Sequence, residues 1–402
     1  MLQVKHLRMW GVIALFTTLG NLNASAQEIK TVFVIAMENH NWTQPANQFG
    51  PGTQQIFQNP NAPFINSLVN GTAFAQINGS AVNISQQVAY ATAYHNALAT
   101  PSGLPDANIH PSEPNYLWAE GGTNFGVFND NDPYAAVNPS NQNTTQHLSG
   151  LLTKAGRTWR SYQEDIDLTT SNGQLTNVPL PEDQWTVPLS SFSGVFGSGL
   201  NQYNGSNQFN YAAKHNPQVL FTDTNGGDDP STANALSTHY APLQQLATDL
   251  ANNAVANYNW ITPDQYNDMH TSLNGGYKGL TGDSANIRQG DDFLSQIVPV
   301  IMASEAYKDH GAIIIWFDET ESDGVAGDSR DDFNHTIGEI VISSAAHSNV
   351  NGVPYASPLN YTHSSDLRTM QELFHVAPFL SDAANAIDLS DLFAPEAIPH
   401  RK

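Results

Sequence analysis

Two apolar runs of this chain end directly in acidic residues. Residues Thr31–Met37 and Ala312–Phe317 contain no charged side chain, as is typical of strands that are buried on both faces of a parallel sheet. Ligand sites in such sheets lie beyond the carboxyl ends of the strands, and carboxylate and amide oxygens suit a divalent cation. Either acidic pair alone is equally compatible with capping of the next helix or with a solvated loop. Together, the two runs predict a metal site formed by the residues that follow them: Glu38, Asn39, Asp318 and Glu319.

A serine between two prolines is a candidate nucleophile. The segment His-Pro-Ser-Glu-Pro-Asn-Tyr at residues 110–116 places Ser112 in a turn bounded by Pro111 and Pro114. A hydroxyl is a poor nucleophile at its ordinary pKa, and a bound cation is one means of activating it. The other interpretation is a serine that caps the start of a helix.

Two histidines lie close to the expected ends of strands. His270 follows an apolar segment at 258–262, and His335 comes after the pair Asp318-Glu319. Imidazole can transfer a proton at moderately acidic pH or ligate a metal ion. The alternative for each residue is a core or surface histidine without a catalytic role, but the positions beside strand ends favour the site.

Strands and helices are expected to alternate along the chain and to position these residues. Such alternation predicts a layered α/β architecture, with a largely parallel central sheet and helices on both faces. Two stretches rich in Asn, Gly and Ser, at 121–146 and 168–208, predict long loops. We find no internal repeat or linker, so we expect a single domain over residues 27–402. The expected strands are 31–37, 158–162, 219–222, 258–262, 312–317 and 337–343, and the expected helices are 64–69, 241–258, 291–307 and 366–374.

The composition indicates an exported, acidic protein. Residues 1–26 contain two cations, an apolar stretch and a small-residue cleavage motif, which predict a signal peptide and a secreted or periplasmic location. The net charge of −23 disfavours binding to nucleic acid and stable binding to anionic membranes. No cysteine is present, so thiolate ligation of a metal is excluded.

Several of these segments occur in an order that resembles a known family. The chain is similar to the phosphoesterase family of acid phosphatases and bacterial phospholipases C, which resembles the alkaline-phosphatase superfamily in fold. The resemblance extends from about Val32 to Phe374. It is carried by Met37–His40, His110–Tyr116, Asn267–His270, Phe317–Glu319 and Asn334–His335, with weaker matches at Trp159–Asp165, Ala213–Pro217, His363 and Leu367–Thr369.

The resemblance implies roles for individual residues. A divalent metal ion of unknown identity would be bound by the four oxygen ligands named above, and Ser112 would attack phosphorus while Asn115 holds a phosphoryl oxygen. His270 and His335 would contact phosphate or protonate the leaving oxygen, or would bind a second metal. His215 and His363 would act through structure. In the two-zinc relatives, an Asp ligand would stand at the position of the pair Glu38-Asn39. Because this chain differs there, the number of metal ions stays open.

The resemblance implies a secreted, metal-dependent acid phosphatase that hydrolyses small phosphomonoesters through a phosphoserine intermediate. With only 14 Lys and Arg residues in the chain, the positive charge that phosphoryl transfer requires is expected to come largely from metal and imidazolium. One alternative is a phospholipase C-type phosphodiesterase, although the loops lack the basic or aromatic character expected at a bilayer. The other alternative is a non-catalytic secreted protein that binds carbohydrate or another partner.

Overall fold

The computed structural model describes residues 28–44, 55–96, 109–321, 335–347 and 352–399. The expected signal peptide therefore lies outside the described residues, as does Asn334.

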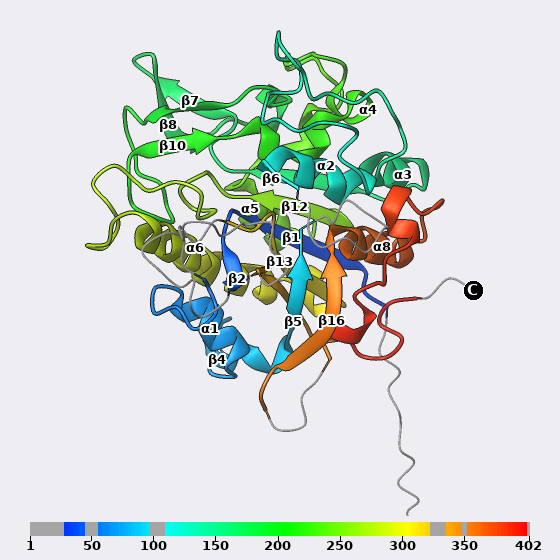
Figure 1. The fold of residues 1–402 in the computed structure, drawn as a ribbon. Coiled ribbons are helices and arrows are strands. Elements are labelled where there is room, and N and C mark those ends of the chain that lie inside the picture. The colour runs from blue at the N-terminus through cyan, green and yellow to red at the C-terminus, as the bar shows by residue number, and fades with distance from the viewer. Residues whose placement is uncertain (1–27, 45–54, 97–108, 322–334, 348–351, 400–402) are drawn as a thin grey trace, which may run out of the picture.

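An eight-stranded sheet forms the centre of the molecule (Figure 1). Neighbouring strands pair in parallel except at β15, which runs antiparallel to both of its neighbours. The predicted α/β fold with a largely parallel sheet is therefore confirmed. The strand order is β11 (Tyr240–Pro242), β6 (Trp159–Gln163), β12 (Tyr258–Thr262), β1 (Thr31–Met37), β13 (Gly311–Phe317), β15 (Glu339–Ser343), β5 (Val88–His95) and β16 (Tyr355–Thr362).

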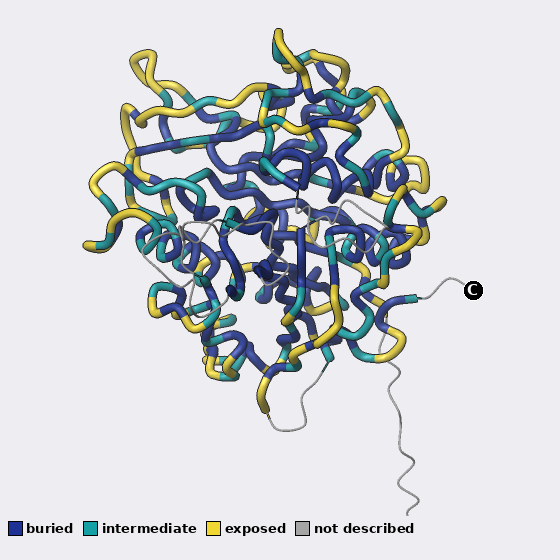
Figure 2. The backbone as a smooth tube through the Cα atoms, viewed as in Figure 1, coloured by how far each residue is buried: buried dark blue, intermediate teal, exposed yellow. Residues whose placement is uncertain are grey.

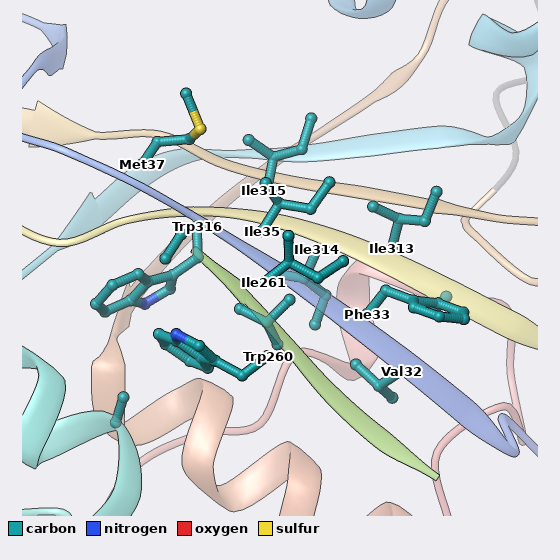
Figure 3. Packing of buried hydrophobic residues seen from close by; sticks show 14 of the residues in the cluster. Val32, Phe33, Ile35, Met37, Trp260, Ile261, Ile313, Ile314, Ile315 and Trp316 are labelled. Carbon is teal, nitrogen blue, oxygen red and sulfur yellow. The ribbon is translucent and has the colours of Figure 1, made fainter. Parts of the chain in front are cut away.

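The apolar runs read from the sequence are the central strands. β1 lies between β12 and β13, and Val34 is in register with Trp260 and Ile314. All three side chains are buried and belong to the packed core, in which Figure 3 labels Trp260 and Ile314. Figure 2 shows that burial is concentrated at the sheet and its flanking helices, whereas the exposed residues gather in outer loops and hairpins. Burial of apolar surface on both faces explains why these strands lack polar alternation.

Helices cover both faces of the sheet, as expected. On one face, α6 (Asp283–Ala303) packs near the end of β1: a Cβ atom at Gly290 would lie 2.3 Å from Met269 Cγ and 2.8 Å from Met37 Cε. A side chain at this position would have to displace these two methionine side chains. On the other face, Trp316 contacts the rings of Tyr116 and His363, which lie on α2 (Ser112–Gly121) and α8 (His363–Leu373).

The helices differ from the sequence expectations at three places. The expected strand 219–222 is wrong: a 3₁₀ helix at Pro217–Leu220 and the short α4 (Thr222–Asn225) occupy it, since a four-residue apolar run does not distinguish a strand from a buried turn. The expected helix 241–258 is reduced to α5 (Gln245–Ala251), between the edge strand β11 and β12. The expected helix 291–307 begins earlier, at Asp283, and ends at Ala303, before the separate α7 (Glu305–Lys308). No helix in the described ranges is long and apolar enough to cross a membrane. The remaining α-helices are α1 (Pro63–Val69) and α3 (Leu148–Lys154).

The expected loop 168–208 contains two hairpins. They extend from the part of the molecule that carries β6 (Figure 1), whereas residues 122–146 are irregular, as expected. The hairpin strands are β7 (Leu168–Ser171) with β8 (Gln174–Pro179), and β9 (Phe192–Val195) with β10 (Gln208–Tyr211). Other two-stranded pairs are β3 (Phe74–Ile77) with β4 (Ser80–Asn83), and β2 (Asn41–Thr43) with β14 (Thr336–Ile337).

This topology brings the candidate residues to one edge of the sheet. The parallel strands β1, β12 and β13 end at that edge, where Glu38, Asp268 and Asp318 follow them. Because β15 is antiparallel, its amino end lies at the same edge, close behind His335. The sheet therefore brings together residues that are far apart in the sequence.

Candidate active site

The predicted metal ligands converge where β1 and β13 end. If the amide of Asn39 turned its nitrogen inward, that atom would lie 3.1 Å from Glu38 Oε2 and 3.2 Å from both Asp318 Oδ2 and Glu319 Oε1. Three carboxylate oxygens thus converge on the side-chain amide of Asn39, whose oxygen supplies a fourth ligand atom when that end of the amide faces inward. Such an arrangement is unfavourable without positive charge, and oxygen ligands of this kind suit a hard divalent cation. These oxygens are of the kind that a divalent cation prefers, and metal binding by this set stays a prediction.

The backbone at Asn39 contributes to the same geometry. Its φ of 42° lies in the left-handed region, which Asn tolerates better than most residues other than glycine. This turn lets the backbone N–H of Asn39 donate a hydrogen bond to Asp318 Oδ1 at 2.9 Å. The end of β1 is thereby fixed to the end of β13.

Ser112 lies at the start of α2, and its hydroxyl faces the ligand oxygens. Ser112 Oγ lies 3.1 Å from Glu38 Oε2, 3.3 Å from Asn39 Oδ1 and 3.4 Å from Glu319 Oε1. Pro111 is the N-cap of the helix, and no side chain caps it. The alternative interpretation is correct that a helix begins here, but Ser112 is its first residue and not its N-cap, and its hydroxyl points into the carboxylate cluster. The positive end of the helix dipole also favours negative charge on this oxygen.

Two further side chains on the same face of α2 reach the ligands. Asn115 and Tyr116 are three and four positions after Ser112, which places them on one helix face. Asn115 Nδ2 donates to Glu319 Oε2 at 3.2 Å and to the carbonyl of Ile109 at 2.8 Å. Tyr116 donates a hydrogen bond to Glu38 Oε1. In the structure, Asn115 therefore supports a ligand, and its expected contact with a phosphoryl oxygen stays a prediction.

His215 lies closer to the ligands than a purely structural residue would. It is buried in the 3₁₀ turn η4 (Ala213–His215), with Nε2 3.3 Å from Glu38 Oε1 and Nδ1 3.5 Å from Asp268 Oδ2. Its ring stacks on Tyr116 with centroids 5.0 Å apart. Potential ligand atoms of Glu38, His215 and Asp268 lie within 4.8 Å of one another, so this group could hold a second cation.

His270 adjoins this group, and its ring is neutral at most pH values. Its backbone N–H donates to Asp268 Oδ1 at 2.7 Å, and its ring centroid lies 5.9 Å from that of His215. Burial and the nearby ammonium of Lys214 lower the pKa of His270 to about 4. A proton on this imidazole is therefore favoured only in acid or beside a bound anion.

His335 and His363 lie at the same sheet edge in different surroundings. His335 is buried, and its backbone bonds the ring of His95, the last residue of β5. His363 bonds the Asp318 carbonyl oxygen through Nε2 at 2.6 Å, while Nδ1 accepts from Trp316 Nε1 at 3.0 Å. These contacts agree with the structural role expected for His363, since they fix the backbone of a predicted ligand.

A second group of buried carboxylates lies at the ends of β6 and β12. Glu164, Asp165 and Asp264 offer oxygens within 4.8 Å of one another. Glu164 already accepts from Asn201 Nδ2 at 2.7 Å and from Asn267 Nδ2 at 3.0 Å. Amide donors thus stabilise this group as part of the loop framework.

Two side chains of the site, Tyr116 and Asp268, were not predicted from the sequence, and His215 was expected to act only through structure. Tyr116 follows from its helical spacing to Ser112 once the helix is taken to start there. Asp268 and His215 lie in segments that carry the family resemblance, but only the fold brings them to Glu38.

The far end of the serine helix is held by a buried histidine. His147 Nδ1 lies 2.9 Å from Glu120 Oε2 near the end of α2, and Nε2 lies 2.8 Å from Asp223 Oδ1. Burial alone would lower the pKa of His147, but the bonds to Asp223 and Glu120 outweigh it and raise the pKa to about 8. Glu120 and His147 thus link the far end of α2 to Asp223.

We expect His147 to make stability depend on pH. Because its pKa is raised on folding, its contribution of about 2 kcal/mol is complete below pH ~6.5 and is lost as pH rises through ~8. Urea unfolding of wild type and His147→Gln at pH 6 and pH 9 measures this contribution to the free energy of unfolding. The wild type should lose about 2 kcal/mol more than the variant between these pH values; equal losses would contradict the assignment.

The chain belongs to the Phosphoesterase family, whose model matches residues 16–377. The family expected from the sequence is thereby confirmed.

Curated relatives of the chain include fungal acid phosphatases. A phosphate-repressible acid phosphatase of Penicillium chrysogenum is 26% identical over 214 residues, which cover 53% of this chain and 39% of the relative. An acid phosphatase of Aspergillus fumigatus is 28% identical over 235 residues, covering 58% of this chain and 40% of the relative. The matched segments thus span about two fifths of these relatives.

Solved structures with a similar arrangement are distant in sequence. A protein in the alkaline phosphatase superfamily from Vibrio parahaemolyticus has a TM-score of 0.45 and 11% identity, covering 92% of this chain and 72% of that one. A lipoteichoic acid synthase from Listeria monocytogenes has a TM-score of 0.45 and 9% identity, covering 90% and 77%.

Proposed function

We propose that this protein is a metal-dependent acid phosphatase that hydrolyses phosphomonoesters through a phosphoserine intermediate. The observation that carries the proposal is the Ser112 hydroxyl, which points at four converging oxygen ligands at the carboxyl edge of the sheet. Family membership and the acid phosphatases among the relatives support the same reaction class.

The proposed reaction begins at the Ser112 oxygen. A divalent cation held by the ligand oxygens would supply positive charge beside this hydroxyl and the phosphoryl group. Ser112 Oγ forms a bond to phosphorus as the ester bond breaks, and its proton passes to a solvent water while an imidazolium of the site protonates the leaving oxygen. Water then attacks the phosphoserine and releases inorganic phosphate.

His270 and His335 are proposed to contact the phosphate or to protonate the leaving oxygen. The lowered pKa of His270 makes its protonated form most abundant in acid, which supports an acid optimum. Export to the periplasm or outside the cell is also proposed, on the character of residues 1–26.

Hydrolysis assays test the proposal. Purified protein is compared on p-nitrophenyl phosphate, bis(p-nitrophenyl) phosphate and phosphatidylcholine, with and without a chelator. The monoester should be hydrolysed fastest, and the chelator should abolish the reaction. Preference for phosphatidylcholine would establish the phospholipase C-type alternative, and inactivity on all three substrates under metal-replete conditions would favour a non-catalytic role.

A further inference from the structure

A lysine lies beside the carboxylate cluster. Lys214 precedes His215 in the turn η4, and only 14% of its side chain is exposed. Its ammonium pairs with Asp130 Oδ2 at 2.7 Å. From the sequence, the positive charge of the site is expected to come largely from metal and imidazolium, so the ammonium of Lys214 is an additional positive charge.

The partner of Lys214 also contacts the helix that carries the nucleophile. Asp130 Oδ1 accepts the backbone N–H of Glu113 at 3.1 Å, and Glu113 directly follows Ser112. One carboxylate therefore links the lysine to the first turn of α2. Both the lysine and the serine are held in place before any substrate arrives.

The ammonium lies next to the side chains that form the site. Lys214 directly precedes His215, whose Nε2 lies 3.3 Å from Glu38 Oε1. The carboxylate of Asp130, 2.7 Å from the Lys214 Nζ, favours the charged form of the amine.

A charged lysine would offset the repulsion between the carboxylates of this site and a phosphate group. Glu38, Asp268, Asp318 and Glu319 are all buried at the sheet edge, and their carboxylates would repel a phosphate dianion. One divalent cation offsets only two negative charges. A fixed ammonium in a poorly solvated site interacts more strongly with an anion than one in water does.

We propose that Lys214 binds the non-bridging phosphoryl oxygens of the substrate and thereby selects phosphomonoester dianions over phosphodiester monoanions. The inference rests on the proposed function of the site. A monoester carries one more negative charge than a diester above its second pKa of about 6, so loss of the ammonium affects the monoester more. A lysine that only pairs with Asp130 to hold the loop would give equal losses for both substrates.

The test compares two neutral variants, K214M and K214Q, with K214R and with the control K278M. Lys278 is an exposed lysine that pairs with Asp292. The kcat/KM values for p-nitrophenyl phosphate and bis(p-nitrophenyl) phosphate are measured at pH 6.5, and binding of inorganic phosphate is measured by calorimetry. Metal content and circular dichroism identify a variant that has lost its fold. If one of the two neutral variants does not fold, the comparison is made with the other.

The neutral variants should lose roughly 10²-fold in kcat/KM for the monoester, less than 10-fold for the diester, and at least 10-fold in phosphate affinity. K214R should retain the monoester preference, and K278M should match wild type. Equal losses on both substrates, or unchanged phosphate affinity, would overturn the role of Lys214. A wild type that binds phosphate through Lys214 but hydrolyses neither ester would overturn the proposed function instead.

Discussion

Ser112→Ala should lose at least roughly 10³-fold in kcat on p-nitrophenyl phosphate while keeping its fold and its metal. The change removes only the oxygen that faces the ligand cluster, and the carboxylates stay in place. Acid quenching of wild type during turnover should trap phosphate on Ser112, detectable by mass spectrometry. Because two successive in-line displacements restore configuration, a chiral phosphate substrate should show net retention at phosphorus.

A matched control removes another buried serine hydroxyl. Ser343 Oγ donates to the Gly311 carbonyl oxygen at 2.9 Å, where β13 begins, at the opposite edge of the sheet. Ser343→Ala should cost about 1 kcal/mol of stability and leave kcat unchanged. Substantial activity in Ser112→Ala, or inversion at phosphorus, would exclude the phosphoserine mechanism.

Asp318→Ala should release the metal ion and lose activity by at least roughly 10²-fold. Asp318 Oδ2 is one of the four converging oxygens, and Oδ1 holds the Asn39 backbone, so the change removes a ligand and loosens a second one. Elemental analysis after gel filtration measures the bound metal in wild type and variant.

Asp291→Ala is the matched control for a buried carboxylate. Asp291 accepts the backbone N–H groups of Phe64 and Ile65 at the start of α1, so its loss should lower stability without changing metal content. Equal metal content in wild type and Asp318→Ala would show that Asp318 is not a ligand.

The features that could be predicted from the sequence are those with a local physical signature. The apolar runs at β1 and β13 identified two central strands, and the acidic residues after them lie together as expected. β5 and β16 were missed because they are less uniformly apolar, and Pro358 interrupts the latter; proline is typical of edge strands.

Other parts of the site depend on contacts between distant segments. The two prolines around Ser112 suggested a turn, but proline is also tolerated in the first turn of a helix, and the chain forms α2 there. The importance of Lys214 follows from Asp130, which lies in the irregular segment after α2. No local pattern in the sequence indicates that pairing.

Binding of the proposed metal ion to the acidic oxygens at the end of β1 would couple folding to the supply of metal. Carboxylates buried this close repel one another in the folded chain, whereas in the unfolded chain they are far apart and hydrated. This repulsion lowers the free energy of unfolding of the metal-free protein. A cation that binds only the folded form adds about 2.7 kcal/mol at a hundred times its dissociation constant. In a metal-poor environment, the protein would then open more often and be cleaved faster by proteases, so that its lifetime, as well as its activity, would depend on the available metal.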